Sequence, residues 1–338
     1  ILLAAMAAEN AEEMLRRKRR KRLLQGLLIG AAAVGVPAIA NAVIRKRAGK
    51  LQPARWGRTQ RYAWSEGEVS FQRMGSGPPL LLLHSFGPGH SGEEWRDVAQ
   101  LLEDRFRIFV PDLLGWGRSE KPAITYDGEL YIQLIDDFLH DVIGQRAVIL
   151  AAGLPAAYAL QIAVDYPERV RALGLVVPQG LEVHSEQPDL KDALVHRLLK
   201  VPVLGTSALN LYTSKKSLSH HLRQEVFASE ETATPSLVEH HYVASHQRGA
   251  HSALAAYVAG YLNHNARELL PRLTCPSWLV WGRQAVQPPV EAADLWLRHL
   301  HGSELQVFEG SATLPHAEQP RAFCRGLLNF LGDVGASL

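Results

Sequence analysis

From about residue 61 onward, short apolar runs alternate with stretches of helical periodicity, and this alternation constrains the fold more than any other feature. Continuous apolar runs are typical of strands that are buried on both faces. Such strands, alternating with helices, predict a parallel sheet covered by helices on both sides. The expected strands are 68–73, 79–84, 107–111, 147–151, 172–177, 277–281 and 304–308, and the expected helices are 95–102, 131–143, 156–165, 289–300 and 320–331.

The alternation is interrupted between residues 181 and 270, where the pattern is helical and rich in histidine. We therefore expect a helical cap over 181–270, inserted between a first core segment at 61–180 and a second one at 271–338. The histidines show no metal-ligand spacing and are interpreted as residues on helix surfaces. We expect neither a metal nor another cofactor.

Four motifs, in order along the chain, resemble the α/β-hydrolase superfamily. The resemblance is to the capped branch that contains epoxide hydrolases and haloalkane dehalogenases. It implies an α/β-hydrolase fold, with a mostly parallel eight-stranded sheet flanked by helices and a helical cap insertion. The motifs are LLLHSFG at 81–87, PDLLGWGRS at 111–119, YPERV at 166–170 and LPHAEQP at 314–320.

The resemblance also implies three positions for a catalytic triad, and none of them carries a suitable residue. The family's nucleophile lies in a G-x-S-x-G turn, thirteen residues before the tyrosine of the YPERV motif, which places Gly153 there. Ala285 stands at the position of the acid and Thr313 at that of the base. Glycine has no side chain that could attack a substrate, so covalent catalysis at this turn is excluded. The sequence therefore predicts a pseudoenzyme without catalytic residues.

The former substrate pocket below the cap is expected to be lined by Ser85, Phe86, Leu154 and His316. A shift of register would make His316 the base, but it would supply neither a nucleophile nor an acid. This pocket suggests two alternative functions. One is a ligand-binding or sensor protein that holds a small apolar ligand, and the other is a serine-independent hydrolase of unknown substrate.

The N-terminal part of the chain has a different composition from the body. A basic segment at 1–22 ends in the run RRKRRKR, and an uncharged stretch of 22 residues follows at 23–44. As a helix this stretch would be about 33 Å long, close to the ~30 Å hydrocarbon thickness of a bilayer. It predicts a single transmembrane helix, joined to the body by a linker at 45–60. A helix lying in the membrane interface or docked on a partner, and a cleaved signal peptide, are alternatives.

Gly26, Gly30 and Gly35 give this stretch a small-residue spacing that lets another helix approach closely in a membrane. We predict integral membrane protein subunits as partners that pack on 23–44, in a bacterial inner membrane or an organellar membrane. The sequence does not indicate on which side of that membrane the globular body would lie.

The charge of the chain is divided unevenly between these parts. Residues 1–61 hold 14 of the 36 Lys and Arg and 3 of the 34 Asp and Glu, so the remainder holds 22 and 31. An acidic body argues against a nucleic-acid partner. The leading hypothesis is a catalytically inactive, membrane-anchored accessory subunit of a membrane protein complex.

Overall fold

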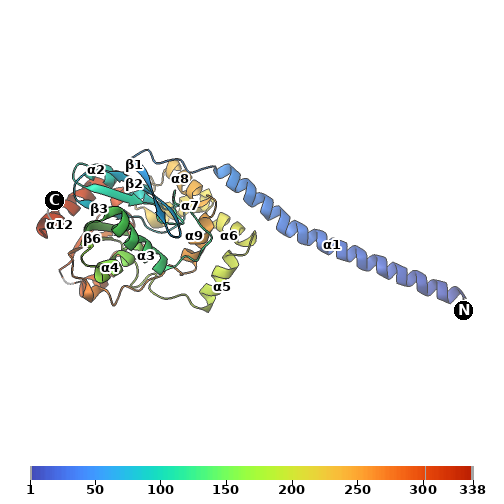
Figure 1. Ribbon diagram of the computed structural model, residues 1–338. Coiled ribbons are helices and arrows are strands. Elements are labelled where there is room, and N and C mark those ends of the chain that lie inside the picture. Colours follow the sequence, from blue (N-terminus) through green and yellow to red (C-terminus); the bar gives the residue numbers. More distant parts are fainter. Residues whose placement is uncertain (1, 301, 336–338) are drawn as a thin grey trace.

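Figure 1 shows the computed structural model, which describes residues 2–300 and 302–335. Within the first helix, the side chains of residues 2–13, 15 and 23–32 lie outside the described part. This helix, α1 (Leu2–Ala48), extends away from a globular body that contains all the strands.

One eight-stranded sheet forms the centre of the body, in the order β1-β2-β4-β3-β5-β6-β7-β8. β1 pairs with β2, and β2 with β4, in antiparallel orientation, whereas the five other pairings are parallel. This confirms the predicted mostly parallel eight-stranded sheet. The strands are β1 (Arg58–Trp64), β2 (Gly67–Met74), β3 (Pro79–Leu83), β4 (Arg107–Pro111), β5 (Ala147–Ala152), β6 (Val170–Val176), β7 (Ser277–Gly282) and β8 (Glu304–Phe308).

β1 is the strand that the apolar pattern did not predict. It lies at the edge of the sheet, and its burial alternates, with Arg58 and Arg61 exposed and Trp64 buried. A strand that faces water on one side carries polar residues at every second position, so it lacks a continuous apolar run.

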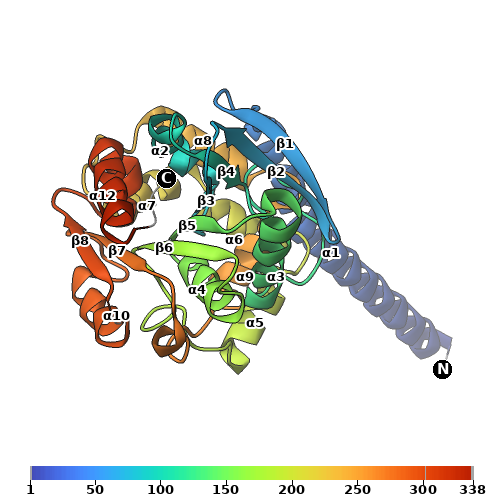
Figure 2. The same cartoon turned by 60° about the vertical axis from the view of Figure 1, so that its left-hand side comes forward.

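Helices cover both faces of the sheet, as predicted (Figure 2). α2 packs against α12 on one face, and α3 packs against α4 on the other. Short 3-10 or π turns extend or precede several of these helices. The elements outside the cap are η1 (Gly92–Trp95), α2 (Arg96–Leu102), α3 (Gly128–Phe138), η2 (Leu139–Ile143), α4 (Pro155–Asp165), η4 (Leu270–Arg272), η5 (Val290–Ala292), α10 (Ala293–His299), α11 (Pro315–Glu318) and α12 (Pro320–Asp333).

Between β6 and β7 the chain forms a helical cap, at the end of the body from which α1 leaves (Figure 1). Its elements are α5 (Leu190–Leu199), α6 (Leu204–Tyr212), α7 (Lys215–His221), η3 (Leu222–Val226), α8 (Pro235–Ser245) and α9 (Ala250–Val258). α1 contacts this cap through α6.

The prediction of a transmembrane helix over 23–44 is wrong. In the described part of the chain, no helix combines the length and the apolar character that crossing a bilayer requires. The same finding corrects the prediction of a single-pass membrane location. The stretch is interrupted by the polar residues Gln25 and Asn41 and by Pro37, and its C-terminal end docks on the body, where Asn41 hydrogen-bonds to Val203 and Ser207.

The predicted packing of partner subunits on this helix stays a prediction. Gly26 and Gly30 fall within residues 23–32, so their packing lies outside the described residues. At Gly35, no described atom lies within 4 Å of the place where a Cβ would stand.

Candidate functional site

Gly153, at the predicted nucleophile position, forms the turn between β5 and α4. Its backbone is left-handed, with φ of +65°, which glycine adopts without steric cost. A Cβ built on Gly153 would stand 3.4 Å from the Cβ of Ser85. The turn geometry of a nucleophile position is therefore present, and the side chain nearest to it belongs to Ser85.

The two other predicted triad positions serve packing and cap attachment. Ala285 is buried after β7, with its N–H donating to the carbonyl of Gly282. The Thr313 hydroxyl donates to the carbonyl of Glu225 (2.8 Å), and its N–H donates to the carbonyl of Val226 (3.0 Å). Thr313 thereby ties the loop before α11 to the cap.

A different serine, histidine and carboxylate converge beside Gly153. Ser85 Oγ lies 2.8 Å from His90 Nδ1 and 2.9 Å from Glu94 Oε2, and His90 Nδ1 lies 3.1 Å from Glu94 Oε2. All three residues are buried or nearly so. These distances are within the range for proton transfer between a side chain and its base.

The loop between β3 and α2 brings the three side chains together. Ser85 follows the end of β3, and its N–H donates to Glu94 Oε1 (2.8 Å). The N–H of His90 donates to the carbonyl of Gly87 in a tight turn. Ser91 then caps η1 by accepting from the N–H of Glu93, and this turn of helix points Glu94 back toward Ser85.

Glu94 is held ionised by two imidazoles. Burial by itself would raise the pKa of Glu94, but His316 and His90 outweigh it and hold this pKa well below its usual range. His316 Nε2 is 3.5 Å from Glu94 Oε1, and its ring stacks on Trp95 with 3.7 Å between the centroids. Burial lowers the pKa of His316, and the neighbouring Glu94 offsets this only in part.

The cluster differs from a linear Ser-His-Asp arrangement. In that arrangement one ring nitrogen faces the serine and the other faces the acid. Here Nδ1 of His90 is close to both Ser85 Oγ and Glu94 Oε2, which leaves Nε2 for a further partner.

A cavity of about 410 Å³ lies between η1, α2 and α8 of the cap. Its lining is mixed, and includes His90, Glu94, Leu237, His240, His241 and Leu314. Among the described residues, no group of three His, Cys, Asp or Glu side chains is arranged to hold a metal ion.

The four predicted pocket residues occupy two different environments. Ser85 and His316 contact Glu94 and so belong to the cluster. Phe86 is buried in a group of aromatic rings, 5.1 Å from Trp116 and 4.8 Å from Tyr131 between centroids, and Leu154 is fully buried. A small ligand bound by all four residues stays a prediction.

Comparison with known proteins agrees with the topology. The sequence model of the Alpha/beta hydrolase family matches residues 80–325, most of the body. The chain belongs to this family.

Two curated relatives of this α/β hydrolase cover most of its length. It is 27% identical over 280 residues to an uncharacterized protein of Mycobacterium tuberculosis, which covers 75% of each chain. It is also 27% identical to the pimeloyl-[acyl-carrier protein] methyl ester esterase of Vibrio vulnificus. That alignment of 281 residues covers 78% of this chain and 98% of the relative. Among solved structures, a serine hydrolase involved in carbazole degradation superposes with a TM-score of 0.66, at 21% identity over 81% of this chain and 98% of its own.

These relatives correct the prediction of an inactive protein. Several of them, among them the methyl ester esterase and the serine hydrolase, carry the names of working hydrolases, which points to an enzyme. The prediction rested on three positions in the sequence. It placed Ser85 in the pocket but did not connect it with His90 and Glu94, whose contacts with it depend on how the loop after β3 folds. One signal was available: a serine, a histidine and a glutamate lie within ten residues after a buried strand.

Proposed function

We propose that this α/β hydrolase cleaves carboxylic esters with His90 as the general base. The observation that carries the proposal is the position of His90, which lines the cavity while its Nδ1 lies between Ser85 Oγ and Glu94 Oε2. The ester class is suggested by the curated methyl ester esterase to which the chain is similar.

In the proposed reaction, water in the cavity attacks the ester carbonyl carbon. His90 Nε2 takes a proton from that water as the new C–O bond forms. The same nitrogen returns the proton to the alcohol oxygen as the old C–O bond breaks, so the products are an acid and an alcohol. A positioned histidine base contributes on the order of 10²–10⁴ in rate.

Ser85 and Glu94 are positioning residues in this proposal. An ionised carboxylate beside Nδ1 favours the tautomer in which Nδ1 carries the proton and Nε2 is free to act as a base. The Ser85 hydroxyl donates to the same carboxylate and fixes its orientation. Ser85 is absent from the lining of the cavity, which His90 and Glu94 do line, and this favours water over Ser85 as the nucleophile.

The test is hydrolysis of p-nitrophenyl esters of short acids by purified protein. We expect H90Q to lower kcat by about 10²–10⁴, with melting temperature checked separately. S85A and E94Q should lower kcat less than H90Q, leave KM nearly unchanged and shift the pH–rate profile. H220Q is the matched control, because His220 is an exposed cap histidine.

A fluorophosphonate probe separates the two possible nucleophiles. It labels activated serines, and we expect no labelling of Ser85. Stoichiometric labelling that S85A abolishes would make Ser85 the nucleophile and refute the water mechanism. Activity that H90Q leaves intact, or no activity on any ester, would refute His90 as the base of an ester hydrolase.

A further inference from the structure

The cap carries a row of exposed leucines on α5. Leu190, Leu194 and Leu198 are 91%, 57% and 57% exposed, and their spacing places them on one side of the helix. On the adjacent α6, Leu204 and Leu211 are 60% and 75% exposed. We call these five leucines the cap face. A single exposed leucine needs no explanation, but a group of this size marks an interaction surface.

The exposure of these leucines is not a result of a frayed helix end. Asp189 accepts hydrogen bonds from the N–H groups of Lys191 and Asp192, and the Asp192 side chain accepts from the N–H of Asp189. This capping box fixes the start of α5. The apolar side of α5 therefore faces outward on an ordered helix.

The long helix α1 leaves the body beside the cap face. Asn41 Nδ2 donates to the carbonyl of Val203 and to Ser207 Oγ, both at 3.1 Å, and Asn210 Nδ2 donates to Asn41 Oδ1 at 2.9 Å. These contacts join α1 to α6. Figures 1 and 2 show α5, α6 and the C-terminal end of α1 at the same end of the molecule.

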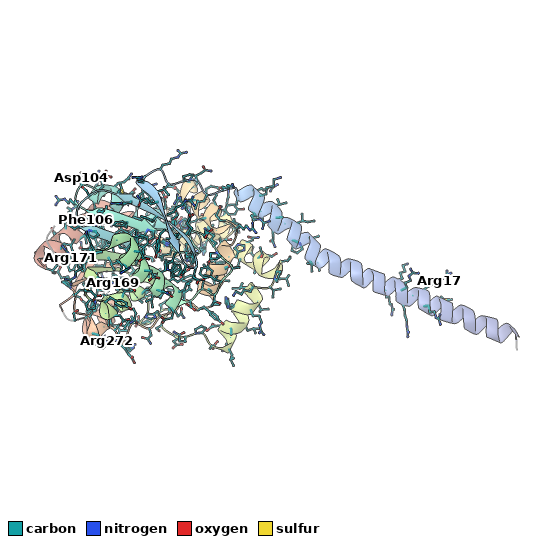
Figure 3. All side chains as sticks on the ribbon, in the orientation of Figure 1. Arg17, Asp104, Phe106, Arg169, Arg171 and Arg272 are labelled. Atoms are coloured by element: carbon teal, nitrogen blue, oxygen red, sulfur yellow. The ribbon has the colours of Figure 1, made fainter. Side chains whose placement is uncertain are left out.

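α1 carries strong positive charge. Residues 14–48 contain ten Lys and Arg and no Asp or Glu. Seven of the ten form the run at 16–22, whose side chains are exposed. Figure 3 shows Arg17 on the part of α1 that extends away from the body. The other three are at 45–47, so an anionic surface would be attracted on both sides of the uncharged stretch.

We propose that the cap face and α1 together form a peripheral docking surface for an anionic lipid bilayer, with no segment crossing it. Acyl chains would accept the five leucines, and lipid phosphates would pair with the cations of α1, as in other interfacial helices. A second copy of the chain would bring two cationic helices together, and nucleic acid would leave the leucines in water. The proposal goes beyond ester hydrolysis and does not depend on it.

The test is flotation of the full chain with phosphatidylcholine vesicles, with and without phosphatidylglycerol. We expect binding to be about tenfold tighter or more when phosphatidylglycerol is present, and to weaken with salt. L194E/L198E should reduce binding by about tenfold or more. R19Q/R20Q/K21Q should remove most of the preference for phosphatidylglycerol. L101E is the matched control, because Leu101 is an exposed leucine on α2 in the body.

Several results would overturn the proposal. Equal binding to both vesicle types, or equal losses in L101E and L194E/L198E, would exclude the cap face as a docking surface for anionic lipid. A stable dimer in solution that L194E/L198E dissociates, without vesicle binding, would assign the face to self-association. Binding of DNA without binding of vesicles would assign α1 to nucleic acid. Circular dichroism of each variant verifies that it is folded.

Discussion

Ser85 lies directly beside Gly153, so that a Cβ on Gly153 would stand 3.4 Å from the Ser85 Cβ, an ordinary van der Waals distance. The turn after β5 thus keeps the conformation of a nucleophile position, with φ of +65°, although its own residue has no side chain. The space that such a side chain would reach is bordered by Ser85, which belongs to the His90 and Glu94 cluster.

We expect Gly153→Ala to lower the free energy of unfolding by about 1–2 kcal/mol, the cost of a left-handed backbone for a residue with a Cβ. The measurement is urea denaturation. Gly144→Ala is the matched control, because Gly144 has φ of +63° and its added Cβ would meet only the His140 carbonyl, at 3.8 Å. A loss at Gly153 that far exceeds the loss at Gly144 would show that Ser85 does not leave room for a Cβ.

Glu94 makes the protein sensitive to acid. Because its pKa is lowered in the folded state, it stabilises the fold above the ordinary pKa of 4.5 and loses this effect as pH falls through the folded value. We expect Glu94→Gln to cost about 3 kcal/mol at pH 7, and the difference from the natural chain to shrink below about pH 4. Denaturation at several pH values measures this. Glu66→Gln, at an exposed site, should show no such trend.

His251 should destabilise the fold at mildly acidic pH. Burial, with a smaller effect from His246, lowers the pKa of His251 to about 4, and its Nε2 has no hydrogen-bond partner among the described residues. The unfolded chain binds a proton near the ordinary pKa of 6.5, so stability falls as pH drops below that value. His251→Leu should be more stable than the natural chain by about 1–2 kcal/mol at pH 5, and by less at pH 8.

Thermal melting at the two pH values measures the effect of His251. His220→Leu is the control, because His220 is exposed on α7. If both variants gain equally at pH 5, the gain comes from removing any histidine and not from the buried position of His251.

Asn41 should fasten the end of α1 to the cap. Its side chain hydrogen-bonds to Val203 just before α6 and to Ser207 and Asn210 on α6, so we expect Asn41→Ala to weaken the docking of α1 by about 1–2 kcal/mol. Trypsin should then cleave faster at Lys50 and Arg55, which follow the helix. Gln52→Ala is the control, since Gln52 bonds only to the nearby Lys50 carbonyl through its amide nitrogen. Equal cleavage rates in the two variants would contradict the role of Asn41.

The predicted strands and helices of the body correspond closely to those of the structure, apart from β1. The five strands from β3 to β7 were the most recognisable, because each has an apolar run that reflects burial on both faces. The polar edge strand lacks such a run. The transmembrane prediction depended on the length of an uncharged stretch, and that length does not show that the end of the stretch docks on the cap through Asn41.

The sequence by itself determined the order of strands and helices and the glycine turn at 153, because both follow from local periodicity and from a short motif. Only the tertiary structure decided which groups meet above the sheet. His316 reaches Glu94 from the far end of the chain, and residues of α8 in the cap line the cavity together with His90. Packing of distant segments sets those distances, and no local pattern of residues records them.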